Sequence, residues 1–220
     1  MSAHRRVFPL LEPYVGSRVF EVGCGTGALT ERLLARAELV FGIESDEACR
    51  DALLGAVGSH PRFVFRPWRL QDCNVELLLG QAFDTVVCVY ELEHVEDDAS
   101  AIKLFGAVVA AQAGRVVLLV PAPPPAFAFR NVLRNPQRYY TRRGLAELIE
   151  RAGLTPRVIR YANLIGLLGW YYKAIFPPAT RVEEVIGTPL GLSLLAVADT
   201  GGSARKPVTV GAPRPVTAPG

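Results

Sequence analysis

The 220-residue chain has few cysteines and histidines. They do not cluster in the way that a metal site or a redox-active cysteine pair requires. Cys24, Cys49, Cys73 and Cys88 are widely scattered, with no C-x-x-C pair and no histidine at metal-ligand spacing. This pattern is typical of reduced thiols in a cytosolic protein. The sequence therefore predicts neither a disulfide nor a bound metal ion, and it favours a cytoplasmic location.

Long apolar runs and a strong charge of one sign are also missing. No uninterrupted apolar run approaches the ~20 residues that a membrane-spanning helix needs, and no basic segment followed by an apolar one opens the chain. We therefore expect no integral membrane segment and no secretory signal. The formal charge is only +3, and Arg205, Lys206 and Arg214 account for all of it, because the last twenty residues contain no acid. The global charge therefore does not favour nucleic-acid binding.

The chain does contain enough hydrophobic residues for one domain. Half of its residues are hydrophobic, which suffices for one sizeable core, whereas a second full domain would be hard to fit. We assign residues 1–200 to that domain. Residues 201–220 are rich in Gly, Pro, Thr and Ala and have almost no large apolar side chains, so we expect a disordered tail.

Apolar, β-rich runs alternate with helical stretches after a helical N-terminal segment. The predicted strands are Val19–Val22, Leu39–Glu44, Arg62–Phe65, Phe83–Val89 and Arg115–Val120, followed by strands near Arg157–Tyr161 and from Leu192 to Ala198. The fourth and fifth runs lack polar alternation, as expected when helices cover both faces of a sheet. A further helix is predicted over Thr141–Ala152, with Thr141 as its cap and Gly153 at its end. The rhythm predicts an α/β fold with a doubly wound, mostly parallel sheet.

The most informative local feature is a glycine-rich loop between the first strand and the next helix. Residues 20–30 read FEVGCGTGALT. Gly23, Gly25 and Gly27 permit a sharp turn and a close approach of the backbone to a ligand. The loop alone fits S-adenosylmethionine or NAD, because its spacing also matches the looser dinucleotide fingerprint.

One carboxylate favours S-adenosylmethionine over NAD, and a second supports a nucleoside cofactor of either kind. Glu21 would repel a pyrophosphate at the helix N-terminus but would suit the α-ammonium of S-adenosylmethionine, while N–H groups after the glycines would receive that cofactor's carboxylate. Glu44 lies 21 residues after Gly23, at the end of the second predicted strand. A carboxylate at this position accepts hydrogen bonds from the ribose hydroxyls of either cofactor. We therefore predict that the chain binds S-adenosylmethionine.

The glycine loop, Glu44, Asp72 and the segment 83–98 together resemble the class I S-adenosylmethionine-dependent methyltransferases. Residues 83–98 read FDTVVCVYELEHVEDD, and LEHVEDD after a buried strand is unusual in NAD enzymes. The resemblance spans roughly residues 5–200, and the segments 120–122 and 163–170 match a bacterial branch. It implies a Rossmann-like fold with a seven-stranded sheet whose last strand is antiparallel. It also implies methyl transfer from S-adenosylmethionine to an acceptor.

The resemblance implies roles for individual residues on the cofactor side. The residues expected to bind the cofactor are Glu21, Gly23, Cys24, Gly25, Gly27, Glu44, Ser45, Gln71, Asp72, Cys73 and Tyr90. Among them, Glu21 would hold the methionine moiety, Glu44 the ribose and Asp72 the adenine amino group. Tyr90, just beyond the fourth strand, would line the methionine end.

The loop after the fourth strand supplies the candidate for proton transfer. His94 is a possible general base, because imidazole titrates near neutrality and this loop opens toward the site. The alternative is that His94 only caps or packs at the start of a helix. The acids of this loop are interpreted as a solvated helix entrance, favoured by the positive helix end; they are Glu91, Glu93, Glu96, Asp97 and Asp98.

The acceptor side is less well defined. The candidate acceptor-binding residues are Phe127, Arg138, Tyr139 and Trp170. The basic segment with Arg130, Arg134, Arg138, Arg142 and Arg143 fits either an anionic acceptor or a solvated helical face. The apolar segment 163–176 could pack in the core or cover the active site as a lid. It could also bind an apolar acceptor, form a dimer contact or rest on a membrane surface. The chain departs from the bacterial branch at residues 135–140 and after Trp170, so the acceptor does not carry over.

The sequence as a whole predicts a methyltransferase that acts on a small-molecule biosynthetic intermediate by in-line transfer. A non-catalytic S-adenosylmethionine-binding protein that works through protein contacts is the alternative, and an NAD-dependent oxidoreductase is a third possibility. The acceptor, the methylated atom and the oligomeric state stay open at this point.

Overall fold

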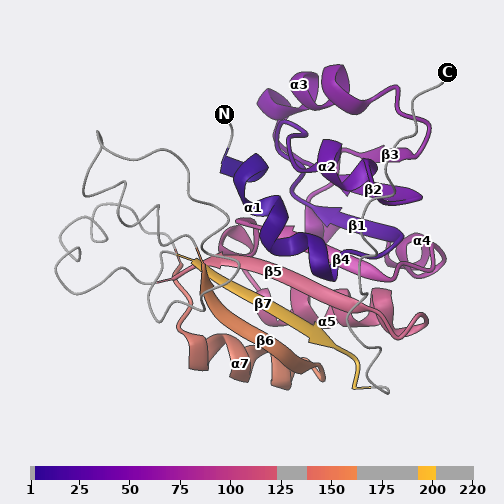
Figure 1. The fold of residues 1–220 in the computed structure, drawn as a ribbon. Helices are drawn as coiled ribbons and strands as arrows, with labels where there is room; N and C mark the ends of the chain where they lie inside the picture. The colour runs from indigo at the N-terminus through magenta and orange to yellow at the C-terminus, as the bar shows by residue number, and fades with distance from the viewer. Residues whose placement is uncertain (1–2, 123–137, 163–192, 202–220) are drawn as a thin grey trace, which may run out of the picture.

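A seven-stranded sheet with helices on both faces forms the framework of the protein (Figure 1). The computed structural model describes residues 3–122, 138–162 and 193–201. The strands are β1 (Arg18–Val22), β2 (Leu39–Ile43), β3 (Phe63–Arg66), β4 (Thr85–Val89), β5 (Arg115–Pro121), β6 (Thr155–Ala162) and β7 (Ser193–Asp199). The helices are α1 (Ala3–Leu11), α2 (Thr30–Leu34), α3 (Glu47–Val57), α4 (Val75–Leu79), α5 (Asp98–Ala110) and α7 (Arg142–Arg151).

The strand order is β3-β2-β1-β4-β5-β7-β6. The pairs among β1 to β5 are parallel, whereas β7 runs antiparallel to both β5 and β6. This arrangement confirms the predicted doubly wound, mostly parallel sheet with an antiparallel last strand. The order reverses between β1 and β4, and in such sheets the carboxyl ends of the strands at the reversal form a ligand-binding crevice.

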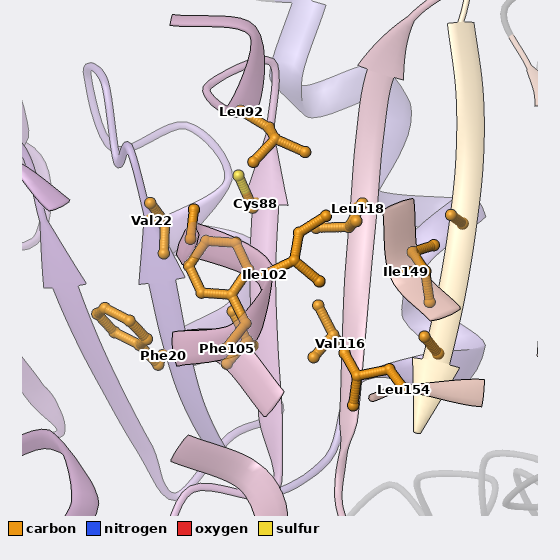
Figure 2. Close-up of a cluster of buried hydrophobic side chains, with 14 of the residues drawn as sticks. Phe20, Val22, Cys88, Leu92, Ile102, Phe105, Val116, Leu118, Ile149 and Leu154 are labelled. Carbon is orange, nitrogen blue, oxygen red and sulfur yellow. The ribbon is translucent and has the colours of Figure 1, made fainter. Parts of the chain in front are cut away.

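Alternate residues of the strands face two separate hydrophobic layers. On one face, Phe20, Val22 and Leu118 pack with Phe105 of α5 and Ile149 of α7 (Figure 2). On the other face, sheet residues that include Val19, Val40, Val87 and Val117 pack against α1, α2 and α3. Burying one such large side chain contributes about 1.5–3 kcal/mol, so the two layers together fix the positions of the strand ends.

Local signals set the ends of the helices. The Thr141 hydroxyl accepts a hydrogen bond from the Gly144 N–H at 3.0 Å, which confirms the predicted cap of α7. Gly153 follows α7 with a φ of +83°, as predicted for a residue that ends a helix. Asp97 caps α5, since its carboxylate accepts from the Ser100 N–H at 2.9 Å.

Several other expectations concern the chain as a whole. The four cysteines are unpaired. Within the described ranges, each helix is too short or too polar to cross a bilayer. The predicted disordered tail lies outside the described residues from residue 202 onward, and so do Phe127, Trp170 and the apolar segment 163–176.

Candidate functional site

A cavity of about 270 Å³ opens at the carboxyl ends of β1, β2 and β4, at the reversal in strand order. Its walls are Val22 and Gly23 after β1, Ile43, Glu44 and Ser45 after β2, residues 68–71 after β3, and Glu91, His94 and Val95 after β4. Four separate loops thus converge on one hollow. Five residues predicted from the sequence line it, namely Gly23, Glu44, Ser45, Gln71 and His94.

The glycine loop forms one wall and is tied to the end of β2. Gly23, Gly25 and Gly27 have φ angles of +76°, +51° and +84°, which a residue with a side chain adopts only with strain. The N–H groups of Gly23 and Cys24 donate to the Ile43 carbonyl at 3.0 and 3.1 Å. The backbone path of this loop therefore requires glycine at all three positions. The hydrogen bonds to the Ile43 carbonyl hold Gly23 at the cavity.

Glu44 projects into the same cavity and braces the glycine loop. Its Oε2 accepts from the Gly25 N–H at 2.8 Å, and its Oε1 accepts from the Asp46 N–H at 2.7 Å. These two bonds fix the orientation of the carboxylate. Since each carboxylate oxygen can accept more than one hydrogen bond, acceptor capacity remains for a ligand hydroxyl.

Glu21 lies outside the cavity, although the sequence suggests it as the partner of a cationic ligand. Its side chain is 1% exposed, and among the described residues neither of its carboxylate oxygens has a hydrogen-bond partner. Burial raises the pKa of Glu21 to about 8, and nearby Thr30 and Cys24 lower it only in part. A carboxyl group with this pKa is mostly uncharged at pH 7. The structure therefore does not support the argument that Glu21 attracts an ammonium group and repels a diphosphate.

The alternation of side chains along β1 explains where Glu21 points. Phe20 and Val22 face the layer that contains α5, so Glu21 faces the opposite layer with Val19. There it lies near Thr30 and Cys24, and it is not among the residues that line the cavity.

Glu91 is a cavity residue that the sequence analysis did not identify. The sequence suggests that Glu91 belongs to a solvated helix entrance. In the structure its carboxylate instead lines the cavity and lies against Gly23. A Cβ atom on Gly23 would be only 2.9 Å from Glu91 Oε2. Burial raises the pKa of Glu91 to about 7, and repulsion from Glu44 and Glu93 adds to the rise. The sequence feature that could identify Glu91 is its position two residues beyond a buried parallel strand, at the sheet edge where ligands bind.

The other acids of this loop also have distinct environments. Glu96 and Asp97 are exposed, which agrees with the predicted solvated entrance. Glu93, by contrast, is buried, with an exposed fraction of 7%. Asp98 forms an ion pair with Arg138 at 3.0 Å. The interpretation of these acids as a single solvated group is therefore wrong for Glu91, Glu93 and Asp98.

His94 ends the short 3-10 helix Leu92–His94 and is exposed at the cavity wall. Its backbone N–H donates to the Glu91 carbonyl at 3.0 Å. Because Asp97 caps α5, the structure does not support a capping role for His94. The general-base role stays a prediction.

Tyr90 joins the end of β4 to the last strand. Its hydroxyl lies 2.7 Å from the Ser193 hydroxyl at the start of β7. Its φ of +54° is unusual for a residue with a side chain, and such strain occurs mainly at functional sites. Tyr90 is absent from the walls of the cavity and packs against the layer of α1 to α3.

The segment after β3 contributes both predicted and unpredicted residues. Gln71 lines the cavity, whereas Asp72 is exposed outside it. Cys73 lines a neighbouring cavity of about 490 Å³ that shares Gln71 as a wall. Trp68 and Arg69 also line the first cavity, although no sequence motif marks them. Adenine recognition by Asp72 therefore stays a prediction without support from the lining of this cavity.

Arg138 holds the loop after β4 instead of presenting a free cation. Its guanidinium donates to the Val95 carbonyl at 2.9 Å and to the Glu96 carbonyl at 3.2 Å, in addition to its ion pair with Asp98. Arg142 likewise donates to the Ile159 carbonyl at 3.0 and 2.7 Å. The contacts of Arg138 and Arg142 thus do not support binding of an anionic acceptor by these two residues. Tyr139, the next predicted acceptor contact, is half-buried beside Arg138.

Comparisons with known proteins agree with this geometry. Residues 20–114 match the family described as "Methyltransferase domain". Over 125 residues the chain is 31% identical to the ubiquinone biosynthesis O-methyltransferase of Pseudomonas syringae pv. tomato, an alignment that covers 56% of this chain and 48% of that protein. Residues 20–114 contain the glycine loop, Glu44 and the loop after β4.

Over residues 20–114, which make up less than half of its length, the chain is therefore similar to a methyltransferase domain. The fold of the chain is also found in solved structures. An S-adenosylmethionine-dependent methyltransferase from Mesorhizobium loti has a TM-score of 0.60 at 17% identity, with 88% of this chain and 97% of that chain covered. Magnesium protoporphyrin IX methyltransferase from Synechocystis, solved with bound S-adenosylhomocysteine, has a TM-score of 0.57 at 15% identity, covering 89% and 79%.

The chain spans about half the length of the curated methyltransferase relatives that it matches. The cavity nevertheless suits the cofactor of the family. Its lining includes the carboxylates of Glu44 and Glu91, which favour a cationic nucleoside over a diphosphate, and a glycine backbone that a ligand can approach closely. The described part of the chain has no group of three metal-binding side chains positioned to hold an ion.

Proposed function

We propose that this protein is an S-adenosylmethionine-dependent methyltransferase that acts on a small-molecule biosynthetic intermediate. The observation that carries the proposal is the acid-lined cavity beside the glycine loop, at the reversal in strand order. The family match over residues 20–114 supports the same function. Hydroxyl acceptors are the first class to test, because the curated relatives are named O-methyltransferases.

In this proposal the residues of the chain bind and orient two reactants. Glu44 would accept the ribose hydroxyls, and Gly23 would allow the methionine moiety to approach the backbone. S-adenosylmethionine supplies an activated methyl group when it is bound. The remaining task of the protein is to place the acceptor in line with that group and to exclude water.

His94 is proposed to remove the acceptor proton. It is exposed at the wall of the cavity, on the loop that Arg138 holds through the Val95 and Glu96 carbonyls. A base is needed for a poorly ionised hydroxyl, because transfer to its oxygen leaves a proton to be removed. Arg138 would then act as a positioning residue for this loop.

Binding and transfer measurements on the purified protein test the proposal. Isothermal titration calorimetry should show binding of S-adenosylmethionine and S-adenosylhomocysteine but not of NAD. Labelled-methyl transfer is then screened against hydroxyl, amine and carbon acceptors from fractionated metabolites. Binding of NAD without either sulfur compound would refute the proposed function, and binding without transfer to any fraction would favour a non-catalytic binding protein.

A variant of His94 tests the proton-transfer step separately. His94→Ala should lower kcat by about 10²–10⁴-fold while the affinity for S-adenosylhomocysteine stays near that of the wild type. Glu96→Gln is the matched control, because Glu96 is an exposed residue of the same loop outside the first cavity. Full turnover of His94→Ala would remove His94 from the mechanism.

A further inference from the structure

A cavity that binds S-adenosylmethionine must neutralise a cation. The methionine end of this cofactor carries an ammonium group next to the sulfonium, and charge without a counter-charge is costly in a partly buried site. Glu21, the acid that the sequence suggests, is buried near Thr30 and Cys24 and lies outside the cavity lining. The carboxylates that line the cavity are Glu44 and Glu91.

The two cavity carboxylates are placed differently. Glu44 is held by the Gly25 and Asp46 N–H groups, at the end of β2 where the ribose is expected. Glu91 comes from the loop after β4 and leans over Gly23, with its Oε2 2.9 Å from the position of a Cβ on that glycine. Both acids thus contact the glycine loop, Glu44 through the Gly25 N–H and Glu91 at Gly23, where the methionine moiety is expected.

We propose that Glu91 supplies the carboxylate that pairs with the positively charged methionine end of the cofactor. This inference rests on the proposed function and assigns to Glu91 the role that the sequence suggests for Glu21. The pairing makes the cavity selective for a cation, because a diphosphate in the same place would meet the charge of Glu91 as well as that of Glu44.

The charged groups around Glu91 determine how cofactor binding depends on pH. Glu44 faces it from the end of β2, and Arg69 lines the same cavity after β3. Glu93 and His94 lie on its own loop, and Glu21 is buried in β1. Burial is the main cause that raises the pKa of Glu91 to about 7. Repulsion from Glu44 and Glu93 adds to this rise.

Cofactor binding should therefore release a proton from Glu91. The bound cation favours the ionised carboxylate, so the pKa of Glu91 falls on binding and affinity rises with pH. A group with a pKa near 7 is about one-tenth ionised at pH 6 and about nine-tenths ionised at pH 8, so affinity should rise about tenfold between them.

The experiment is isothermal titration calorimetry of S-adenosylhomocysteine and S-adenosylmethionine at pH 6, 7 and 8. Wild type, Glu91→Gln, Glu21→Gln and Glu96→Gln are compared, and two buffers of different ionisation enthalpy report the protons released. At pH 8 Glu91→Gln should bind both ligands roughly tenfold or more weakly than the wild type, because a charge-assisted bond is lost. It should also lose the rise in affinity with pH, whereas Glu96→Gln should match the wild type.

Several outcomes would overturn the inference. Equal affinity of Glu91→Gln and wild type at all three pH values would remove Glu91 from cofactor binding, and a loss confined to Glu21→Gln would return the role to Glu21. If Glu91→Gln does not fold, as judged by circular dichroism, the wild type decides: binding with no proton release between pH 6 and 8 contradicts the proposal. A wild type that binds neither sulfur compound would refute the proposed function itself.

Discussion

Glu21 is a buried carboxyl group that should make the stability of the cofactor-free protein fall as the pH rises. Its ordinary pKa of 4.5 applies to the unfolded chain, whereas burial raises the pKa in the folded protein to about 8. Between these two values the folded state keeps the proton and the unfolded state releases it, so a rise in pH favours unfolding. Below the window both states are protonated, and above it neither is.

The size of the effect follows from the two pKa values. They differ by about 3.5 pH units, and each unit corresponds to about 1.4 kcal/mol. Through Glu21 alone, the free energy of unfolding should fall by up to about 5 kcal/mol across the window. Since folded domains are stable by only about 5–15 kcal/mol, one side chain would then account for a large part of the total.

The variant Glu21→Gln keeps the shape of the side chain and removes its titration. Urea unfolding followed by circular dichroism at pH 5, 6, 7 and 8 gives the free energy of unfolding of variant and wild type. Their difference should grow in favour of the variant by roughly 1.4 kcal/mol per pH unit. Glu91 also titrates near neutrality, but it is present in both proteins and cancels from the difference.

Glu96→Gln is the control for this series. Glu96 is exposed, so the stability of this variant should run parallel to that of the wild type at every pH. A difference between Glu21→Gln and wild type that is the same at pH 5 and pH 8 would refute the reasoning. It would mean that the folded protein does not raise the pKa of Glu21.

Two further changes test the packing around the site. Gly42→Ala should lower the free energy of unfolding by about 1–3 kcal/mol, because the new Cβ would be 2.4 Å from Cys24 Sγ. Gly55→Ala in α3 is the control, because its new Cβ meets nothing within 4 Å and should not destabilise the protein. Equal urea midpoints for the two variants would contradict this. Tyr140→Phe removes a hydroxyl that lies 3.3 Å from the Leu92 carbonyl, so it should cost about 1 kcal/mol and speed amide exchange in residues 92–98. Unchanged exchange there would show that the hydroxyl does not hold the loop.

The backbone of the site follows from local sequence. The pattern of apolar runs places β1 and β2 to within one residue of their observed ends, and the glycines at 23, 25 and 27 adopt the positive φ angles that their turn requires. Thr141 caps α7 as its residue type suggests. These features depend on residues close together in the sequence, so short-range patterns are enough to predict them.

The direction of side chains at the cavity depends instead on tertiary structure. Glu21 and Glu91 both adjoin the end of a buried strand, yet the first faces the core and the second faces the cavity. The chain turns after β4 at Tyr90, whose positive φ no local motif announces. The contacts of Arg138 with Val95 and Glu96 join residues more than forty positions apart, so its structural role was not visible in the basic segment.

The place of β7 in the sheet has a consequence for synthesis on the ribosome. β7 is the last strand among the described residues, but it lies between β5 and β6. While residues 163–192 are still being added, the nascent sheet ends at β5, and the described pairing of β6 waits for β7. An apolar strand with unpaired backbone groups is a template for intermolecular pairing. The growing chain is thus most exposed to aggregation during this interval, when a chaperone that shields β5 would help most.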